Sequence, residues 1–402
     1  MHIAILAPSD KFSISQFLHN QDLASLPNGY SGAPFISTLI AEFLSQNHQV
    51  TAITYSIALN GNYEIKTYDF GKFSWIVVPK RPHSFRMNGN KIGYMLDFFA
   101  YEQQLMINCI REIAPDFVHA HWSYEFAGVA IKSGIPCLVT VHDNANKVLR
   151  FIKNLYRFGR LLMAEYNLNR VRFASTPSPY MQAYTEKRCK VVKVIANPTL
   201  ISASAVEVAA SVLIKIQTLA APRLIIINNG WNALKNGRSA LLAFKQLQHQ
   251  LPNATLHLFG DGSELNGLAN QEALSLNLSN VTYYGVVPHN QLIEEIRQAH
   301  VLIHPALEES FGAVLIEAMS FGVPVIGGRN SGAVPWVIND ERLLVDVSKP
   351  EKIVQKTLAL LSDANRYQEI SNQSYNNVST RFSSKLVADA YLSYYNEILR
   401  AW

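Results

Sequence analysis

Two glutamates, Glu309 and Glu317, lie eight residues apart in a stretch that is otherwise mostly apolar or small. Phe311 and Gly312 stand between them, where a short helix is expected to begin. The first N–H groups of a helix have no carbonyl partner inside it, and they can bind a phosphate or a sugar oxygen. Two carboxylates, free amides and a helix dipole therefore converge on what the sequence predicts to be a ligand site.

The elements expected to position these residues are a strand, a loop, a short helix and a second strand. Val301–His304 and residues 323–326 are short apolar runs, typical of buried parallel strands. Residues 313–321 are expected to form the helix, which Gly322 and Pro324 would end.

Glu317 needs an explanation, because its helix is apolar nearly all round and a helix of that kind is buried. An unpartnered buried carboxylate costs roughly several kcal/mol, so Glu317 is expected to be paired, neutralised or turned to a polar ligand. Glu309 falls in the loop beyond the carboxyl end of a strand, where open α/β sheets bind ligands. The alternative is an apolar strand–helix–strand unit with one satisfied core glutamate.

The pattern E-x7-E, with SFG inside it and EAM at its end, resembles the signature of the retaining GT-B glycosyltransferases of family 4. The resemblance implies an α/β fold of two Rossmann-like domains facing a central cleft. It also implies that Glu309 binds hydroxyls of the donor sugar, that the amides of Phe311 and Gly312 hold sugar and phosphate, and that Glu317 binds the nucleotide ribose.

Further motifs follow the family order in the C-terminal half. Gly260 lies in a GDG turn, and Val287 lies in a YYGVVP segment whose backbone holds the base in the family. Lys235 is the candidate for the diphosphate contact, with Arg238 as a possible substitute and an exposed helix-start lysine as the alternative. The sequence departs from the family at three positions. Trp231 stands where the family has an Arg, Trp336 where it often has a Glu, and Arg342 where it usually has a Gly.

The N-terminal half offers a glycine loop and strand-end histidines. The loop around Gly29 and Gly32 resembles the family loop beside the donor diphosphate and the acceptor, although ordinary turns use the same residues. The resemblance gives His142, in a T-x-H-D pattern, a contact to the donor sugar, and His121 becomes its neighbour on the acceptor side. The alternatives are hydrogen-bonded core histidines or metal ligands, and no third residue with zinc-like spacing lies nearby.

Length and composition indicate a globular protein of two domains. The chain has 402 residues, of which 49% are hydrophobic and 16% charged, and this excludes a disordered chain. We expect an N-terminal domain over 1–196, a C-terminal domain over 197–380, and a last helix over 381–402 that crosses back to the first domain as in GT-B proteins. Three scattered cysteines, the lack of a signal-peptide pattern and the lack of a membrane-spanning run favour the cytoplasm.

The net charge of +5 is modest, and its bias lies in residues 147–172. The spacing of charged and apolar residues here predicts a basic amphipathic helix, which could lie on the inner face of an anionic membrane. A solvated basic face on a packed helix is the alternative. No nucleic-acid motif accompanies it, so nucleic acid is not expected as a partner.

The sequence thus predicts a retaining glycosyltransferase that moves a sugar from a nucleotide-diphosphate sugar to a glycan or lipid-linked acceptor, in cell-surface polysaccharide synthesis. Glu309, His142 and Lys235 are the expected catalytic residues. The chain contains no D-x-D, so neither a metal nor a cofactor is expected, and Lys235, amides and the helix dipole must stabilise the leaving group. The alternatives are a GT-B epimerase or hydrolase and a non-catalytic binding protein, the latter suggested by Trp231 and Trp336.

Overall fold

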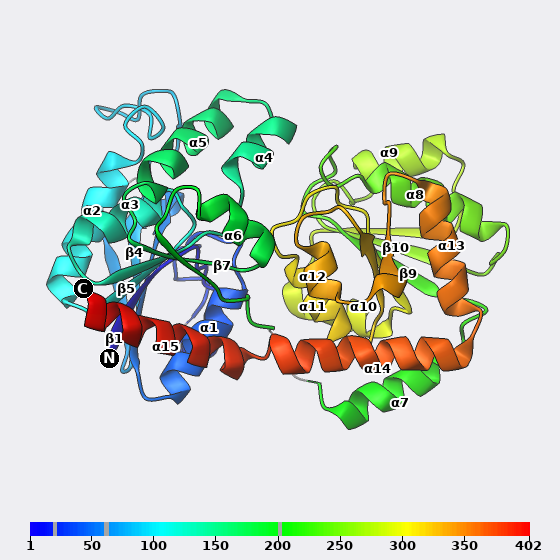
Figure 1. The fold of residues 1–402 in the computed structure, drawn as a ribbon. Coiled ribbons are helices and arrows are strands. Elements are labelled where there is room, and N and C mark those ends of the chain that lie inside the picture. The colour runs from blue at the N-terminus through cyan, green and yellow to red at the C-terminus, as the bar shows by residue number, and fades with distance from the viewer. Residues whose placement is uncertain (19–21, 60–63, 200–202) are drawn as a thin grey trace. The chain divides into compact units, whose positions relative to one another are not determined.

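The computed structural model describes residues 1–18, 22–59, 64–199 and 203–402. The chain divides into two compact units (Figure 1). Unit 1 comprises Met1–Leu200 and Ser384–Trp402, and unit 2 comprises Ile201–Ser383. The chain therefore enters unit 2 four residues after the expected boundary at 196, and it returns to unit 1 three residues after the expected boundary at 380.

Unit 1 is built on a sheet with the strand order β3-β4-β2-β1-β5-β6-β7-β8. Its strands are β1 His2–Leu6, β2 Gln49–Ser56, β3 Lys66–Phe70, β4 Phe73–Pro79, β5 Phe117–His121, β6 Cys137–Thr140, β7 Phe173–Thr176 and β8 Val191–Val194. All neighbours pair in parallel except β3, which pairs antiparallel with β4. Its helices are α1 Phe35–Ser45, α2 Ala100–Ile113, α3 Glu125–Ser133, α4 Ala145–Phe151, α5 Leu155–Leu168, α6 Pro179–Thr185 and α15 Ser384–Ala401, with short 3-10 turns at Ser15–Phe17 and Ile57–Leu59.

Alternation along the central strand places a core on each face of this sheet. Ile3 and Ile5 of β1 belong to the cluster shared with α1 and α15, whereas Ala4 and Leu6 belong to the cluster shared with α2, α3 and α6. Successive strand residues point to opposite faces, so a strand covered on both sides is apolar throughout.

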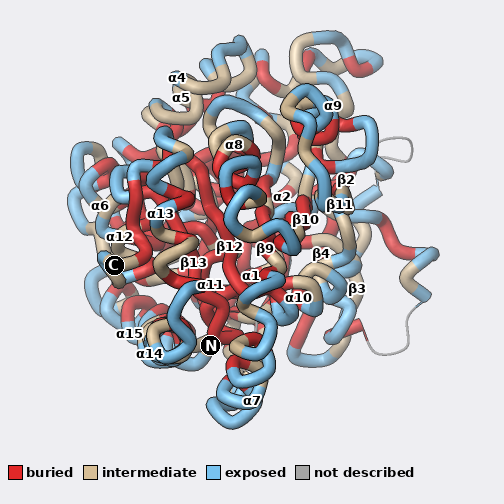
Figure 2. Tube along the Cα trace, turned by 90° about the vertical axis from the view of Figure 1, so that its right-hand side faces the viewer, coloured by how far each residue is buried: buried red, intermediate tan, exposed pale blue. Residues whose placement is uncertain are grey.

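Unit 2 has the strand order β11-β10-β9-β12-β13-β14, all parallel. Its strands are β9 Arg223–Ile227, β10 Thr255–Phe259, β11 Val281–Gly285, β12 Val301–His304, β13 Val325–Gly328 and β14 Leu344–Val345. Its helices are α7 Ala205–Ile216, α8 Gly237–Gln248, α9 Leu268–Ser275, α10 His289–Gln298, α11 Ala313–Met319, α12 Val334–Ile338, α13 Pro350–Leu361 and α14 Ala364–Arg381, with a 3-10 turn at Glu341–Leu343. Figure 2 shows β12, β13 and most of α11 in the colour of buried residues.

Helix α11 and strand β13 differ slightly from the expected ranges 313–321 and 323–326. The helix ends at Met319 because Gly322, at φ 64°, turns the chain and its N–H bonds to the Met319 carbonyl. Pro324 has no N–H to donate, and β13 begins only at Val325.

The expected single basic helix over 147–172 is wrong, because two helices occupy this region. Asn144 and Asn154 each begin a helix by accepting a backbone N–H on the side-chain oxygen, from Lys147 and Arg157 respectively. Arg160 is buried rather than solvated and forms an ion pair with Glu125 of α3. No helix in the described part of the chain is both long and apolar enough to cross a membrane.

Candidate functional site

The order of strands in unit 2 marks one place for a ligand. From β9 the chain proceeds to β10 and β11 on one side, and from β12 to β13 and β14 on the other, while β9 and β12 pair in parallel. Open α/β sheets bind ligands outside the carboxyl ends of strands at such a switch point. Asn228 directly follows β9 and His304 ends β12.

The loop after β9 is folded so that Lys235 faces the loop after β12. The Asn232 side-chain oxygen accepts the N–H groups of Leu234 and Lys235 at 3.0 and 3.2 Å. Asn236 has the left-handed φ of 50°, and its side-chain amide donates to the carbonyls of Pro305 and Val347, both at 3.0 Å. These bonds tie the two loops together, since Pro305 belongs to the loop that carries Glu309.

Lys235 and Glu309 form an ion pair at the switch point. The Lys235 Nζ donates to Glu309 Oε2 at 3.1 Å, and both side chains are largely buried. His304 Nε2 lies 3.7 Å from the same oxygen. Burial alone would raise the pKa of Glu309, but the Lys235 ammonium and the His304 ring hold it well below its usual range. Glu309 is therefore a carboxylate at neutral pH, held beside a cation.

Two buried side chains at this switch point have polar atoms without hydrogen-bond partners. Both amide atoms of Asn228 and both ring nitrogens of His304 make no hydrogen bond, although the residues are only 1% and 2% exposed and His304 Nε2 lies in ion-pair range of Glu309. Buried polar groups are nearly always hydrogen-bonded, so these atoms at the strand ends are available to hydrogen-bond a ligand or water. Sequence reasoning missed both residues, although each is a polar residue that ends an apolar run.

Gly312 and Phe311 shape the loop before α11. Gly312 has φ 86°, and a Cβ there would lie 2.8 Å from Leu315 Cδ1, so a side chain would strain the loop. The Phe311 ring is 2% exposed and packs on Phe382 and Trp336, with ring centres 5.6 and 6.4 Å away. Phe311 can therefore offer only its backbone to a ligand, and the Trp336 ring lies next to the Phe311 ring.

Glu317 is paired, which is one of the three expected outcomes. His289, at the start of α10, lies with its Nε2 3.0 Å from Glu317 Oε1. Val287 is two residues before His289, in the loop that follows β11. His289, which sequence reasoning missed, therefore connects Glu317, the expected ribose contact, to the segment of Val287, the expected base contact.

Gly260 and Trp231, the departure from the family pattern in the loop after β9, have structural roles. A Cβ at Gly260, where φ is 99°, would lie 1.9 Å from the Asn228 carbonyl oxygen, so only glycine fits. The Trp231 ring lies over Gly237 and donates to Glu272 Oε2 at 3.0 Å. Arg238 lies 3.8 Å from the same carboxylate, on the α9 side, whereas Lys235 is the cation at Glu309.

Unit 1 has its own switch point between β1 and β5. The glycine loop follows β1, and a Cβ at Gly29 would lie 2.3 Å from the Ser9 carbonyl oxygen, so this glycine is required by packing. Gly32, at φ 119°, is exposed, and a Cβ there would meet nothing within 4 Å. Its backbone is therefore open to a ligand.

His121 and His142, at the ends of neighbouring strands, are in direct contact. His121 Nδ1 and His142 Nε2 are 2.9 Å apart, and His121 Nε2 is buried without a partner. Behind them the His119 ring joins Thr140 at 2.7 Å and Tyr395 of α15 at 2.5 Å. The structure therefore brings the two predicted histidines of unit 1 together, as it brings Glu309 and Lys235 together in unit 2.

This histidine pair makes unit 1 sensitive to acid. Burial lowers the pKa of His142 from 6.5 to about 3, so the unfolded chain binds the proton more readily than the folded one. Stability is complete above pH 6.5 and falls as the pH drops towards 3. We expect His142→Gln to remove about 2 kcal/mol of the stability loss between pH 7.5 and 5.0, measured by urea unfolding.

His249→Gln is the matched control for that experiment, because His249 is exposed after α8. Its unfolding free energy should depend on pH as the parent's does. An unchanged pH dependence in His142→Gln would show that this ring does not titrate on unfolding.

Among the residues that the structure describes, no three His, Cys, Asp or Glu side chains are grouped as a metal site.

Comparison with known proteins places both halves of the chain in one family. Residues 220–377 match the model for glycosyl transferases group 1, and residues 33–199 match the model for glycosyltransferase family 4. The chain belongs to the family 4 glycosyltransferases. Its sheets and helices are those of the GT-B fold, as the motif resemblance predicted.

The similarity to individual members of this family is lower. The chain is 26% identical to N-acetyl-alpha-D-glucosaminyl L-malate synthase of Bacillus anthracis over 181 residues, which is 44% of this chain and 46% of the relative. It is 31% identical to the capsular polysaccharide biosynthesis glycosyltransferase CapM of Staphylococcus aureus over 102 residues, covering 25% and 27%. The matches thus span less than half the length of these curated relatives.

Among solved structures, the Anabaena protein HepE in complex with UDP and glucose superposes on this family 4 chain with a TM-score of 0.68. It is 16% identical, and the match covers 99% of this chain and 100% of HepE. At this identity the match shows the shared fold.

Proposed function

We propose that this chain transfers a sugar from a nucleoside diphosphate sugar to an acceptor hydroxyl, with retention at the anomeric carbon. The observation that carries the proposal is the Lys235–Glu309 ion pair at the β9/β12 switch point, beside the unpartnered atoms of Asn228 and His304. A cation, an acceptor of hydroxyl hydrogen bonds and unsatisfied polar groups suit a sugar diphosphate.

In the reaction, the bond between the anomeric carbon and the diphosphate oxygen breaks and a bond to the acceptor oxygen forms. The acceptor proton passes to the departing diphosphate, on the same face of the sugar. Lys235 would stabilise the developing charge on that diphosphate, and Glu309 would then accept hydrogen bonds from sugar hydroxyls. Because the sequence has no D-x-D, we propose that Lys235 does this without a metal ion.

Two further points of the proposal draw on relatives. HepE was crystallised with UDP and glucose, which favours a uridine donor carrying a hexose. The similarity to CapM favours a glycan or lipid-linked acceptor in cell-surface polysaccharide synthesis. Three free, buried cysteines suit a reducing cytoplasm as the place of action.

Thermal-shift titration with UDP, GDP and ADP sugars tests donor binding. A UDP-sugar should raise the unfolding temperature of the parent protein, since ligand at 100 times its Kd stabilises by about 2.7 kcal/mol. Glu317→Ala should lose most of this shift, because it removes the carboxylate next to the base-contact loop. Glu351→Ala, at an exposed position of α13, is the control and should keep the full shift.

The other outcomes separate the alternatives. No shift with any nucleotide sugar would overturn the proposal in favour of a non-catalytic binding protein. Donor turnover that needs no acceptor would instead identify a hydrolase or epimerase.

A further inference from the structure

The outward face of α5 is apolar and exposed. Leu155, Phe158, Leu162 and Tyr166 recur at a spacing of three or four residues and are 64%, 47%, 44% and 54% exposed. Such spacing puts side chains on one face of a helix. The inward face is formed by other residues, among them Met163, Ala164 and Leu168. Helix α5 therefore has a second apolar face that the described residues of unit 1 leave exposed.

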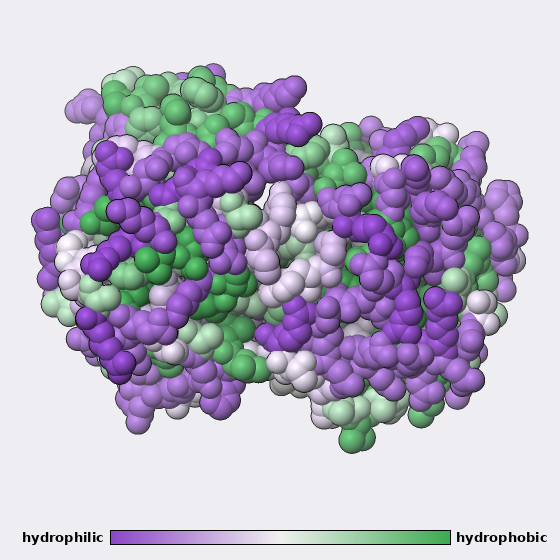
Figure 3. Space-filling view, viewed as in Figure 1, coloured by the Kyte–Doolittle hydropathy of each residue, from purple (hydrophilic) through white to green (hydrophobic). Residues whose placement is uncertain are grey.

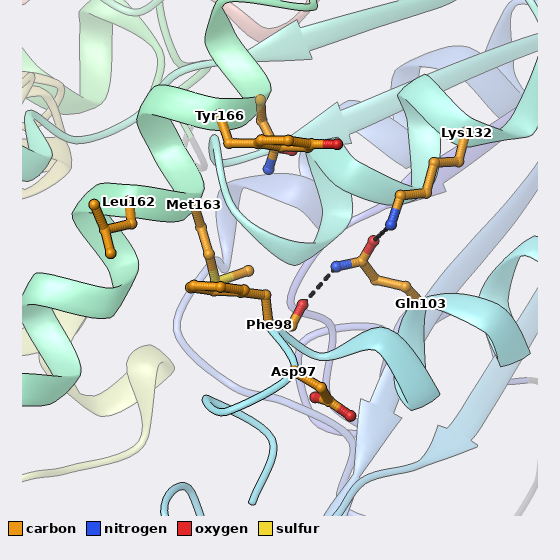
Figure 4. Close-up of a pocket in the computed structure, with 8 residues that line it drawn as sticks. Asp97, Phe98, Gln103, Lys132, Leu162, Met163 and Tyr166 are labelled. Carbon is orange, nitrogen blue, oxygen red and sulfur yellow. Dashed lines mark hydrogen bonds between the residues drawn. The ribbon is translucent and has the colours of Figure 1, made fainter.

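The loop before α2 extends this face. Phe98 is 42% exposed and lines a pocket of about 390 Å³ with Leu162, Met163 and Tyr166 of α5 (Figure 4). The loop packs tightly on the helix, since a Cβ at Gly159 would lie 2.4 Å from Met95 Cε. Figure 3 shows hydrophobic residues gathered over α5 and this loop. Loop and helix thus form one surface, here called the α5 surface: Phe98, Leu155, Phe158, Leu162 and Tyr166.

The backbone is strained where it presents Phe98. Phe98 and Phe99 have φ of 52° and 63°, which is rare for bulky residues. The Phe98 carbonyl accepts from Gln103 Nε2 at 2.7 Å, and Gln103 Oε1 accepts from Lys132 Nζ at 2.9 Å, as Figure 4 shows. Phe99 is buried whereas Phe98 is 42% exposed. The loop therefore holds the Phe98 ring at the surface in a backbone conformation that bulky residues rarely adopt.

Cations outnumber acids around the α5 surface. Residues 144–172 contain seven Lys or Arg, of which Arg160 is buried against Glu125, and one acid, Glu165. Residues 83–96 contain Arg86 and Lys91 and no acid. Glu165 is held by Arg188 at 2.6 Å, and Asp97 is held by Arg81 at 2.8 Å. Both acids are therefore ion-paired, although Arg81 also pairs with Glu102, whereas Arg150 and Lys153 are exposed.

We propose that the α5 surface docks on an anionic lipid bilayer. Exposed Leu, Phe and Tyr flanked by Lys and Arg is the composition of elements that lie in a membrane interface, with the apolar groups among the acyl chains and the cations at the lipid phosphates. A lipid surface accommodates the whole apolar area and the positive rim together. Membrane docking does not require the proposed transferase activity. The proposed function supplies only the reason for docking, because docking would bring unit 1 to a lipid-linked acceptor.

Cosedimentation with vesicles tests the proposal. The parent protein should bind phosphatidylcholine vesicles that contain about 30% phosphatidylglycerol and not pure phosphatidylcholine, and salt should weaken binding. Phe158→Ser/Leu162→Ser should lower the partition coefficient about tenfold or more. Arg150→Gln/Lys153→Gln should lower it about fivefold for each cation removed. The second pair alters only exposed cations, so it tests the proposal even if the first pair fails to fold.

Leu213→Ser/Ile214→Ser is the matched control, because both residues are exposed on α7 of unit 2, at 52% and 66%. It should bind as the parent does. The proposal is overturned if the parent ignores anionic vesicles, or if the α5 variants bind as well as the control. It is also overturned if the parent is a dimer that Phe158→Ser/Leu162→Ser splits, since a second copy would then cover this face. Vesicle binding requires no donor, so its failure is distinct from a failed donor titration.

Discussion

Lys235→Ala should lower kcat by about 10²–10³-fold, the usual effect of removing one group that stabilises developing charge. Lys235 is the cation held at Glu309, 3.1 Å away, with its loop fixed by Asn232 and Asn236. Without it, the departing diphosphate loses its counter-charge, and Glu309 loses one of the two groups that lower its pKa, the other being His304. Release of nucleoside diphosphate from the donor found by thermal shift measures the rate.

Arg238→Ala is the control for Lys235→Ala, because Arg238 is three residues away but is 56% exposed beside Glu272. Its kcat should stay within about threefold of the parent, as for a surface cation. If Lys235→Ala keeps its rate while still binding the donor, or if Arg238→Ala loses it, the phosphate contact has been assigned to the wrong cation.

Arg81→Leu should destabilise unit 1 by about 3–5 kcal/mol, because it breaks a buried ion pair and leaves carboxylates uncompensated. Arg81 is 1% exposed, and its guanidinium donates to Glu102 at 2.7 Å and to Asp97 at 2.8 Å. Glu102 is fully buried on α2. Hydrogen exchange read at the amides of β4 and α2 would report unit 1 separately from unit 2.

The control for Arg81→Leu is Arg329→Leu, which removes an ion pair with Glu341 whose partners are 51% and 72% exposed. A pair in solvent contributes about 0–1 kcal/mol. A loss of under about 1 kcal/mol in Arg81→Leu would mean that water solvates the two carboxylates.

The fold could be predicted because the signals for its strands and helices lie within short stretches of the sequence. Apolar runs of strand length alternate with helical periodicity, and Gly322 and Pro324 mark where α11 ends and β13 can begin. The prediction of a single basic helix over 147–172 was wrong because the spacing of charged residues does not show where a capping residue begins a new helix. The oxygens of Asn144 and Asn154 start separate helices, and the partner of Arg160 lies on another helix, at Glu125.

The candidate site could be outlined only in part from the sequence. Glu309, Lys235 and Glu317 stand in a motif whose order along the chain could be recognised, and the structure pairs the first two. Asn228, His304 and His289 could not be assigned from order alone, because their roles depend on which strands are neighbours and which loops meet. Parallel pairing of β9 with β12 brings Asn228 and His304 to one edge, although the residues are 76 positions apart.

Helix α15 has a consequence for how the chain is made. Its Tyr391 and Tyr395 complete the core that Ile3, Phe43 and Phe117 begin, yet all of unit 2 lies between them in the sequence. During synthesis, unit 2 emerges and can fold while one face of the unit 1 sheet is covered by α1 but still lacks α15. Unit 1 therefore cannot finish folding before unit 2 has left the ribosome, which reverses the usual order in which N-terminal domains mature first.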